Sequence, residues 1–322
     1  MQPLAQRAKI KLAIAPGNMD SLPLFLGLDD GAFTKAGLDP DVTKIQGSAT
    51  AVLPQLAQGQ VDFLLVGVGP GLYNQAAQGF GAKIVASDGI EKAGRFTADM
   101  LNVQRDQANQ IRDLKDLKGK VVDGALAGSP IDMLARAAID QAGLTIGKDV
   151  TLNYNAKTPP DMIALAKNKG ADVIGMTEPI ATQAQQQNLT VKWKNDADII
   201  PWYQPGEVAV SQSLLSSNPA AVEKFLEVYV SESRKINAAN GQWTDELIAS
   251  ATKWTDVPAD VVKAMGGVPY FDPNGAVSMD SLRMTQDFWV KAGQIKTPVD
   301  INGLVDASHL AAVTKAIGTA SS

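Results

Sequence analysis

The sequence contains no cysteine and a single histidine, and these two scarcities exclude several kinds of chemistry. Without cysteine there is no thiolate nucleophile, disulfide, iron–sulfur cluster or cysteine zinc site. A Ser-His-Asp triad could use only His309, which lies at the expected start of a terminal helix. We interpret His309 as a surface or capping residue, and we expect no catalytic residue, no metal and no cofactor.

Long apolar runs and blocks of basic residues are also missing. No apolar segment approaches the roughly 18 residues that a membrane-spanning helix needs. The formal net charge of −5 argues against a nucleic-acid partner, because such proteins concentrate Lys and Arg on one face. Residues 1–6 are polar and lack the apolar core of a signal peptide. The chain is therefore either cytoplasmic or a mature exported chain with an added Met.

The residues that are present predict an α/β protein of two lobes. A chain of 322 residues exceeds one typical domain, and 45% hydrophobic with 20% charged residues fits a globular protein. Strand patterns alternate with helix patterns across short loops, with strands expected at 9–15, 41–45, 61–66 and 83–86. This alternation is a βαβ series. Pro54 falls inside the helix that Ser48 would cap, which predicts that this helix starts later or is kinked.

The stretch from Ile111 to Gly143 carries the strongest local signals. It predicts a helical turn that ends at Gly119 and a short strand over residues 120–123. Ser129-Pro130-Ile131-Asp132 then has the pattern of a capping box with proline at the first helical position. A strand that leads through a small loop to a helix N-terminus presents free backbone N–H groups. In α/β proteins such a terminus captures small ligands.

A glycine-rich loop follows the strand expected at 61–66. Gly67-Val68-Gly69-Pro70-Gly71 does not fit the dinucleotide spacing G-x-G-x-x-G, because Leu72 occupies the last position. The Gly-Lys-Ser/Thr of a Walker A loop is also absent. The segment is therefore either a plain turn between strand and helix or a loop that faces a ligand.

Four motifs in order resemble the nitrate/sulfonate/taurine group of ABC-transporter substrate-binding proteins, which is related to the NMT1/THI5-like proteins. They are LPLFLGLDDGAFTKAGL at Leu22–Leu38, GQVDFLLVGVG at Gly59–Gly69, the DLKGK and GS elements of the stretch described above, and GADVIGMTEP at Gly170–Pro179. Together they cover most of residues 10–205.

The resemblance implies a two-lobed periplasmic-binding-protein fold of type II-like form, with two crossover segments and a ligand cleft between the lobes. Lobe 1 is expected to comprise residues 1–97 and 206–322, and lobe 2 residues 98–205. An internal sequence match indicates that the two lobes share one plan. A helix that ends in glycine precedes a strand that begins with Asp and apolar residues at both Gly59 and Gly170.

The same resemblance implies the substrate-binding component of an ABC importer. Its partners would be a small polar organic solute, such as a sulfonate or carboxylate, and a membrane permease. The protein would be a periplasmic monomer whose signal peptide has been removed, and it would catalyse no reaction. Two alternatives remain: thiamine-pyrimidine-precursor binding or synthesis, as in THI5-like relatives, and a ligand-sensing domain of the same fold. Synthesis would require His and Cys residues with iron. The chain has no Cys and only one His, and this composition disfavours synthesis.

The candidate ligand-binding residues lie in loops after expected strands and in the crossovers. Asn18 and Asp20 follow the first strand, Gly69 lies in the glycine-rich loop, and Ser48 and Ser129 occupy matching positions in the two lobes. Each serine either caps its helix or also contacts a ligand.

Four further candidates lie in or near the second lobe. Glu178 occupies the family's W-D/E-P position with Thr177 in place of the aromatic residue, and it suits an amine or amidine unless it is a helix cap. Arg95 either binds an organic anion or is a surface residue. Trp202 and Tyr203 either form a flat wall for a ligand or pack under the hinge.

Overall fold

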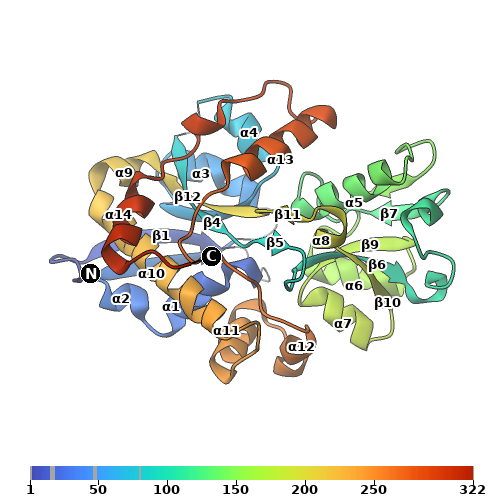
Figure 1. The fold of residues 1–322 in the computed structure, drawn as a ribbon, viewed down its shortest axis with the longest axis horizontal. Helices are drawn as coiled ribbons and strands as arrows, with labels where there is room; N and C mark the ends of the chain where they lie inside the picture. Colours follow the sequence, from blue (N-terminus) through green and yellow to red (C-terminus); the bar gives the residue numbers. More distant parts are fainter. Residues whose placement is uncertain (1, 15–18, 46–48, 80, 322) are drawn as a thin grey trace. The chain divides into compact units, whose positions relative to one another are not determined.

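The computed structural model describes residues 2–14, 19–45, 49–79 and 81–321, and the chain divides into two compact units. The first unit comprises Met1–Ile90, Tyr203–Asp256 and Gly267–Ser322, and the second comprises Glu91–Trp202 and Val257–Gly266. Each unit has its own five-stranded sheet with helices around it (Figure 1). The α/β fold expected from the sequence is confirmed.

The first sheet has the order β2-β1-β3-β12-β4. Its strands are β1 (Ala8–Ile14), β2 (Leu38–Lys44), β3 (Phe63–Gly67), β4 (Ala82–Asp88) and β12 (Gly206–Ser211). β1 runs parallel to β2 and β3, whereas β12 is antiparallel to both β3 and β4. The beginning of β12 therefore lies beside the ends of β3 and β4.

Long and short helices surround the first sheet. The α-helices are α1 (Leu22–Asp29), α2 (Ala32–Lys35), α3 (Leu53–Ala57), α4 (Pro70–Ala76), α9 (Gln212–Ser217), α10 (Pro219–Ala238), α11 (Asp245–Thr255), α13 (Met279–Lys291) and α14 (Ser308–Ile317), with 3-10 turns at Met19–Ser21, Ala49–Val52 and Ile301–Gly303. Phe225 of α10 stacks on Phe63 of β3 with ring centroids 3.8 Å apart, which fixes this helix on the sheet. Pro54 falls in the first turn of α3, so the prediction of a later helix start is confirmed.

The second sheet has the order β10-β6-β9-β7-β8. Its strands are β6 (Asp99–Gln104), β7 (Val121–Asp123), β8 (Thr151–Asn153), β9 (Val173–Thr177) and β10 (Thr190–Asn195). The helices of this unit are α5 (Pro130–Gln141), α6 (Pro159–Lys167), α7 (Ile180–Gln186), α8 (Asp196–Ile199) and α12 (Ala259–Ala264), with 3-10 turns at Arg105–Gln107 and Leu114–Leu117. β7 runs parallel to β8 and β9, so its end and that of β9 meet at one edge.

The local predictions for residues 111–143 hold, with one difference. Gly119 adopts a φ of +77°, and Ser129 caps α5 by accepting from the Asp132 N–H at 3.2 Å. The Asp132 carboxylate does not reach back to the Ser129 N–H as in a full capping box, but accepts from Gly128 N at 2.8 Å. The carboxylate therefore closes the loop that precedes the helix.

The unit boundaries differ from the expected ones. The chain leaves the first unit after Ile90 rather than after residue 97, and it returns at Tyr203 rather than at 206. The short strands β5 (Glu91–Lys92) and β11 (Trp202–Tyr203), which pair, lie at these passages. Residues 257–266 belong to the second unit although the sequence analysis assigned them to the first, because α12 contacts α7 there.

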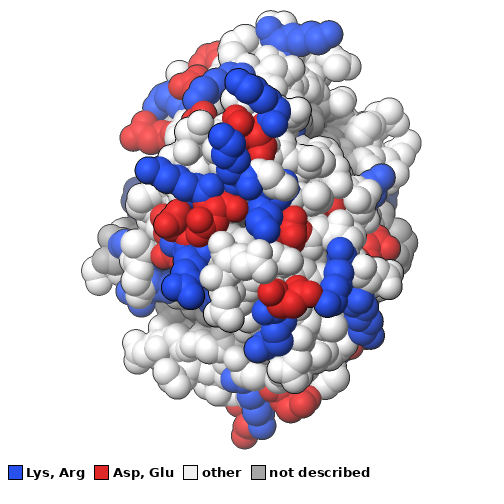
Figure 2. All heavy atoms as spheres, turned by 90° about the vertical axis from the view of Figure 1, so that its right-hand side faces the viewer, with Lys and Arg blue, Asp and Glu red and all other residues white. Residues whose placement is uncertain are grey.

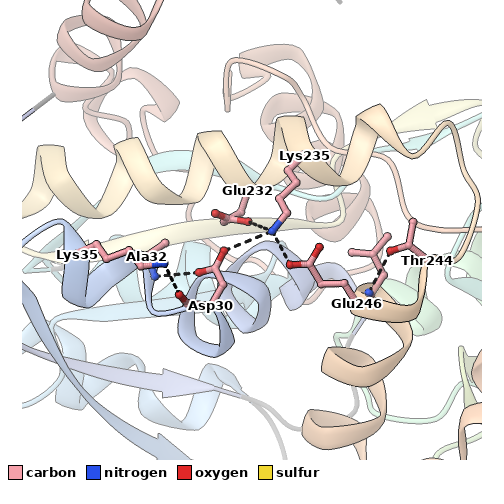
Figure 3. A network of polar contacts seen from close by, with 8 residues as sticks. Asp30, Ala32, Lys35, Glu232, Lys235, Thr244 and Glu246 are labelled. Atoms are coloured by element: carbon pink, nitrogen blue, oxygen red, sulfur yellow. Dashed lines mark hydrogen bonds and ion pairs between the residues drawn. The ribbon is translucent and has the colours of Figure 1, made fainter.

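An ion network joins three helices of the first unit (Figure 3). Lys235 of α10 places its Nζ atom 3.4 Å from Asp30 Oδ2, 3.8 Å from Glu232 Oε2 and 2.6 Å from Glu246 Oε1. Burial, followed by repulsion from Asp30, raises the pKa of Glu232 to about 7. One ammonium group thus offsets the repulsion among carboxylates at the junction of α1, α10 and α11.

We predict that Lys235→Met lowers the free energy of unfolding by about 1–2 kcal/mol, because it leaves the buried Glu232 carboxyl beside two other acids without a cation. Urea denaturation measures the change. Lys315→Met is the matched control, since Lys315 is an exposed helical lysine with no ion pair among the described residues. Equal losses in the two variants would show that the network contributes nothing.

Candidate functional site

The carboxyl ends of the strands form the candidate binding edge in each unit, because open α/β sheets bind ligands there. In the first unit β3 ends at Gly67 and β4 at Asp88, with the start of β12 between them. In the second unit β7 ends at Asp123 and β9 at Thr177. The loops that follow these strands lead to α4, α5 and α7.

The structure distributes the predicted site residues over both units. Asn18 and Ser48 lie outside the described residues. Asp20, Gly69 and Tyr203 belong to the first unit, and Arg95, Ser129, Glu178 and Trp202 to the second. Asp20 lies against the end of β4, because a Cβ atom on Gly89 would lie 3.0 Å from Asp20 Oδ1. Of the two crossover aromatics, Trp202 is 40% exposed and Tyr203 only 1% exposed, so they have different surroundings.

Part of the glycine-rich loop serves helix packing. Gly69 is the N-cap of α4, and its N–H donates to Gly67 O at 2.9 Å. A Cβ atom on Gly71 would lie 2.1 Å from Thr50 Cγ2, so only glycine fits where α4 meets the preceding 3-10 turn. The spacing of these glycines therefore follows from the close approach of two helical segments.

The N-terminus of α5 already holds a carboxylate. Asp132 is fully buried, and its oxygens accept from Gly128 N at 2.8 Å, Arg136 Nε at 2.8 Å and the Tyr154 hydroxyl at 3.0 Å. Burial raises the pKa of Asp132, while the Gly128 N–H and the Arg136 charge oppose this. Because an acid of the chain itself occupies this helix terminus, a bound anion would meet a like charge there.

Glu178 caps α7. The side chain is 1% exposed, its Oε2 accepts from Thr182 N at 3.0 Å, and its Oε1 accepts from the Thr182 hydroxyl at 3.0 Å. Burial raises the pKa of Glu178, and both bonds to Thr182 oppose that effect. The carboxylate thus satisfies donors in the first turn of the helix that follows β9.

Two further acids lie at the edges of the second sheet. Asp123 accepts from Ala125 N at 3.0 Å, Asn155 N at 2.7 Å and Ala156 N at 3.3 Å, and so joins the loops after β7 and β8. Burial raises the pKa of Asp99, at the start of β6, to about 6, with a hydrogen bond from Thr177 opposing the shift.

A buried acid pair in the first unit was missed by the sequence analysis. Asp88 at the end of β4 is 2% exposed and accepts from the Tyr229 hydroxyl at 2.9 Å. Glu207 near the start of β12 is fully buried. The sequence does show an acidic residue within each of two apolar strands, KIVASD and GEVAVS. It does not reveal that these two strands are neighbours in the sheet.

The electrostatics of this pair are dominated by burial. Burial raises the pKa of Asp88 to about 7, and the Tyr229 hydrogen bond lowers it in part. Burial also raises the pKa of Glu207 well above its usual range, and the Asp88 charge adds to that shift. Among the described residues, no group of three or more His, Cys, Asp or Glu is arranged to hold a metal ion.

We predict that the protein is more stable near pH 5 than near pH 8. Asp88 and Asp99 have raised pKa values in the folded state, so their contribution is full below the unfolded pKa of about 4 and is lost as the pH rises through about 6–7. The free energy of unfolding should fall by about 4 kcal/mol between pH 5 and pH 8, since each unit of linkage is about 1.4 kcal/mol. Denaturant titrations of wild type and of Asp88→Asn/Asp99→Asn measure it, and an equal slope in both would contradict the assignment.

We predict that Glu178→Ala costs about 1–2 kcal/mol of stability, whereas Glu178→Gln costs much less. The amide oxygen of glutamine can still accept from Thr182 N, while alanine leaves both Thr182 donors without this partner. Thermal unfolding at constant pH compares the two. Identical melting temperatures for Glu178→Ala and wild type would exclude the capping role.

Comparisons with known proteins agree with the geometry. The model of the family described as NMT1/THI5 like matches residues 18–232, about two thirds of the chain. A search of curated proteins finds no match. None of the helices in the described part of the chain has the length and apolarity that crossing a bilayer requires.

Solved structures share the fold at low sequence identity. The periplasmic aliphatic sulphonate binding protein SsuA from Escherichia coli is 19% identical over 94% of this chain and 92% of its own, with a TM-score of 0.72. The periplasmic nitrate-binding protein NrtA from Synechocystis PCC 6803 is 15% identical over 98% and 90%, with a TM-score of 0.78. A ligand binding component of an ABC-type import system from Staphylococcus aureus, with zinc bound, is 13% identical over 95% and 98%, with a TM-score of 0.76. The fold is that of the periplasmic binding proteins, and the chain belongs to the NMT1/THI5-like family.

Proposed function

We propose that this protein is the substrate-binding component of an ABC importer and captures a small polar organic solute in the periplasm. The observation that carries the proposal is that each unit has a sheet whose carboxyl edge is lined with buried polar groups, in a chain of this family. Proteins of the same fold include a sulphonate-binding protein, a nitrate-binding protein and a ligand-binding component of an import system. A membrane permease would be the protein partner.

The solute would be held between the two units and would draw them together. We propose contacts from Asp20, Gly69 and Tyr203 in the first unit and Arg95, Ser129, Glu178 and Trp202 in the second, with Asn18 and Ser48 as further contacts. Discrimination would come from direct hydrogen bonds, aromatic stacking and exclusion of water, as in other solute-binding sites. The protein would act as a monomer.

We propose that no reaction occurs at this site. The one histidine, His309, lies in α14 with its Nδ1 atom 3.3 Å from Glu223 Oε1. That position is in the first unit, in a helix that contains none of the described candidate residues. The histidine, cysteine and iron chemistry implied for THI5-like synthesis has no counterpart in the residues of this chain.

A thermal-shift screen tests the binding function. The panel would comprise taurine, ethanesulfonate, benzoate, nitrate, benzamidine and 4-aminopyrimidine. A true solute at 100 times its dissociation constant should stabilise the protein by about 2.7 kcal/mol. The same solute should reduce the radius of gyration in small-angle scattering, because closure makes the protein more compact. A saturated complex with the scattering profile of the free protein would contradict capture by closure.

The role of Glu178 can be separated in the same assay. Glu178→Gln removes the charge but keeps the cap, so it should weaken binding by about 1.5–3 kcal/mol only if the carboxylate pairs with the solute. Calorimetry with the solute found in the screen measures this. Unchanged affinity would restrict Glu178 to its structural role in α7.

A further inference from the structure

Glu207 is a buried acid with unsatisfied hydrogen-bonding capacity. Its side chain has 0% exposure, and among the described residues neither Oε1 nor Oε2 has a hydrogen-bond partner. An unpaired polar group in the interior costs free energy, and folded proteins rarely retain one without a use for it. The acids Asp123, Asp132 and Glu178 of the second unit, in contrast, all accept backbone N–H bonds.

Glu207 lies near the candidate binding edge of the first sheet. Glu207 pairs in register with Val66 near the end of β3 and with Ser87 near the end of β4. The preceding residue, Gly206, lies opposite Asp88, and a Cβ atom there would be 3.3 Å from Asp88 Oδ2. Successive side chains point to opposite faces of a strand, so the Asp88 carboxyl lies on the face of the sheet opposite to the Glu207 side chain.

The charged groups that act on this cluster are acids. The pKa of Tyr229 is raised well above its usual range by burial, then by Asp88, with Asp20 and Glu207 adding to it. Glu207 and Asp287 both raise the pKa of Tyr73 on α4. The Tyr73 hydroxyl contacts Leu282 O at 2.7 Å and the Thr285 hydroxyl at 2.6 Å, so it is held by α13.

The net charge of the chain is also concentrated in the unit that contains Glu207. The second unit contains 15 Lys and Arg and 15 Asp and Glu, so the formal net charge of −5 belongs to the first unit. The face of the molecule in Figure 2 shows the two signs interspersed rather than gathered by sign. A field that is negative over the first unit attracts cations and repels anions as they approach.

We propose that the solute carries a cationic nitrogen, a protonated amine or amidine, and that Glu207 binds it. The inference rests on the proposed function and names the ligand class of that same site. An N–H-rich cation supplies the hydrogen bonds that the two Glu207 oxygens lack, and charge-assisted bonds of this kind are the strong ones. In the second unit Asp132 lies in the first turn of α5, where an anion would otherwise bind, and the Glu178 carboxylate accepts from Thr182 N in the first turn of α7.

Binding of such a cation should release a proton from the protein. Burial, followed by the Asp88 charge, raises the pKa of Glu207 well above its usual range, so the free protein favours the protonated form of Glu207. A cation that enters favours the ionised form, so the proton leaves to solvent as the ligand binds. Affinity for a ligand that stays protonated should therefore rise with pH between about pH 6 and pH 8.

The test compares ligands of one shape and different charge. Benzamidine, benzamide and benzoate at millimolar concentration form one set, and taurine with ethanesulfonate forms another. We expect benzamidine or taurine to raise the melting temperature of the wild type, and their matched neutral or anionic analogues to leave it unchanged. Calorimetry of the cationic member in two buffers of different ionisation enthalpy should show proton release. This measurement needs no variant.

Glu207→Gln should weaken binding of the cationic member about tenfold or more while leaving the fold intact, since no described hydrogen bond depends on the carboxylate. Glu223→Gln is the matched control, an acid of the same unit that contacts His309 instead. If benzoate or ethanesulfonate stabilised the protein and the cationic ligands did not, the inference about a cationic solute would be overturned. The proposed importer function would not be affected by that result. Unchanged affinity in Glu207→Gln, or no response to either cation, would also overturn it.

Discussion

The burial of carboxyl groups at the ends of strands is the constraint on which the candidate site depends. Each such group must find donors within the fold, because an isolated ionised acid in the interior is far too costly. Asp123 finds three backbone N–H groups, Asp132 an arginine and a tyrosine, Glu178 a threonine, and Asp88 a tyrosine. These bonds fix the loops after the strands, so the same interactions that offset burial also preorganise the edge at which a ligand would bind.

The two units meet this constraint differently. In the second unit the acids are bonded to the chain itself, and the result is a rigid set of loops around α5 and α7. In the first unit Glu207 lies on the interior strand β12, between β3 and β4, where strand backbones already bond to one another and offer it no free N–H. A central strand position thus leaves an acid unsatisfied far more readily than a loop or a helix terminus does.

Features encoded within a few residues were predictable, and those that depend on distant strands were not. The cap at Ser129 and the displaced helix start at Pro54 follow from local backbone chemistry and agree with the structure. The family, too, is marked by short motifs. Predicting that Asp88 and Glu207 lie on neighbouring strands requires the pairing of strands more than a hundred residues apart. Likewise, no local pattern in residues 257–266 indicates that they belong to the second unit. The ligand-binding roles of the candidate residues remain predictions.

The place of β12 in the first sheet determines which sheet can form first during protein synthesis. β3 and β4 are not neighbours, because β12 separates them, and β12 is translated only after every strand of the second sheet. A ribosome that has reached residue 202 has therefore synthesised all strands of the second sheet, while the first still lacks an interior strand. The N-terminal strands must wait with open edges, which is a period of exposure to aggregation that a chaperone could cover.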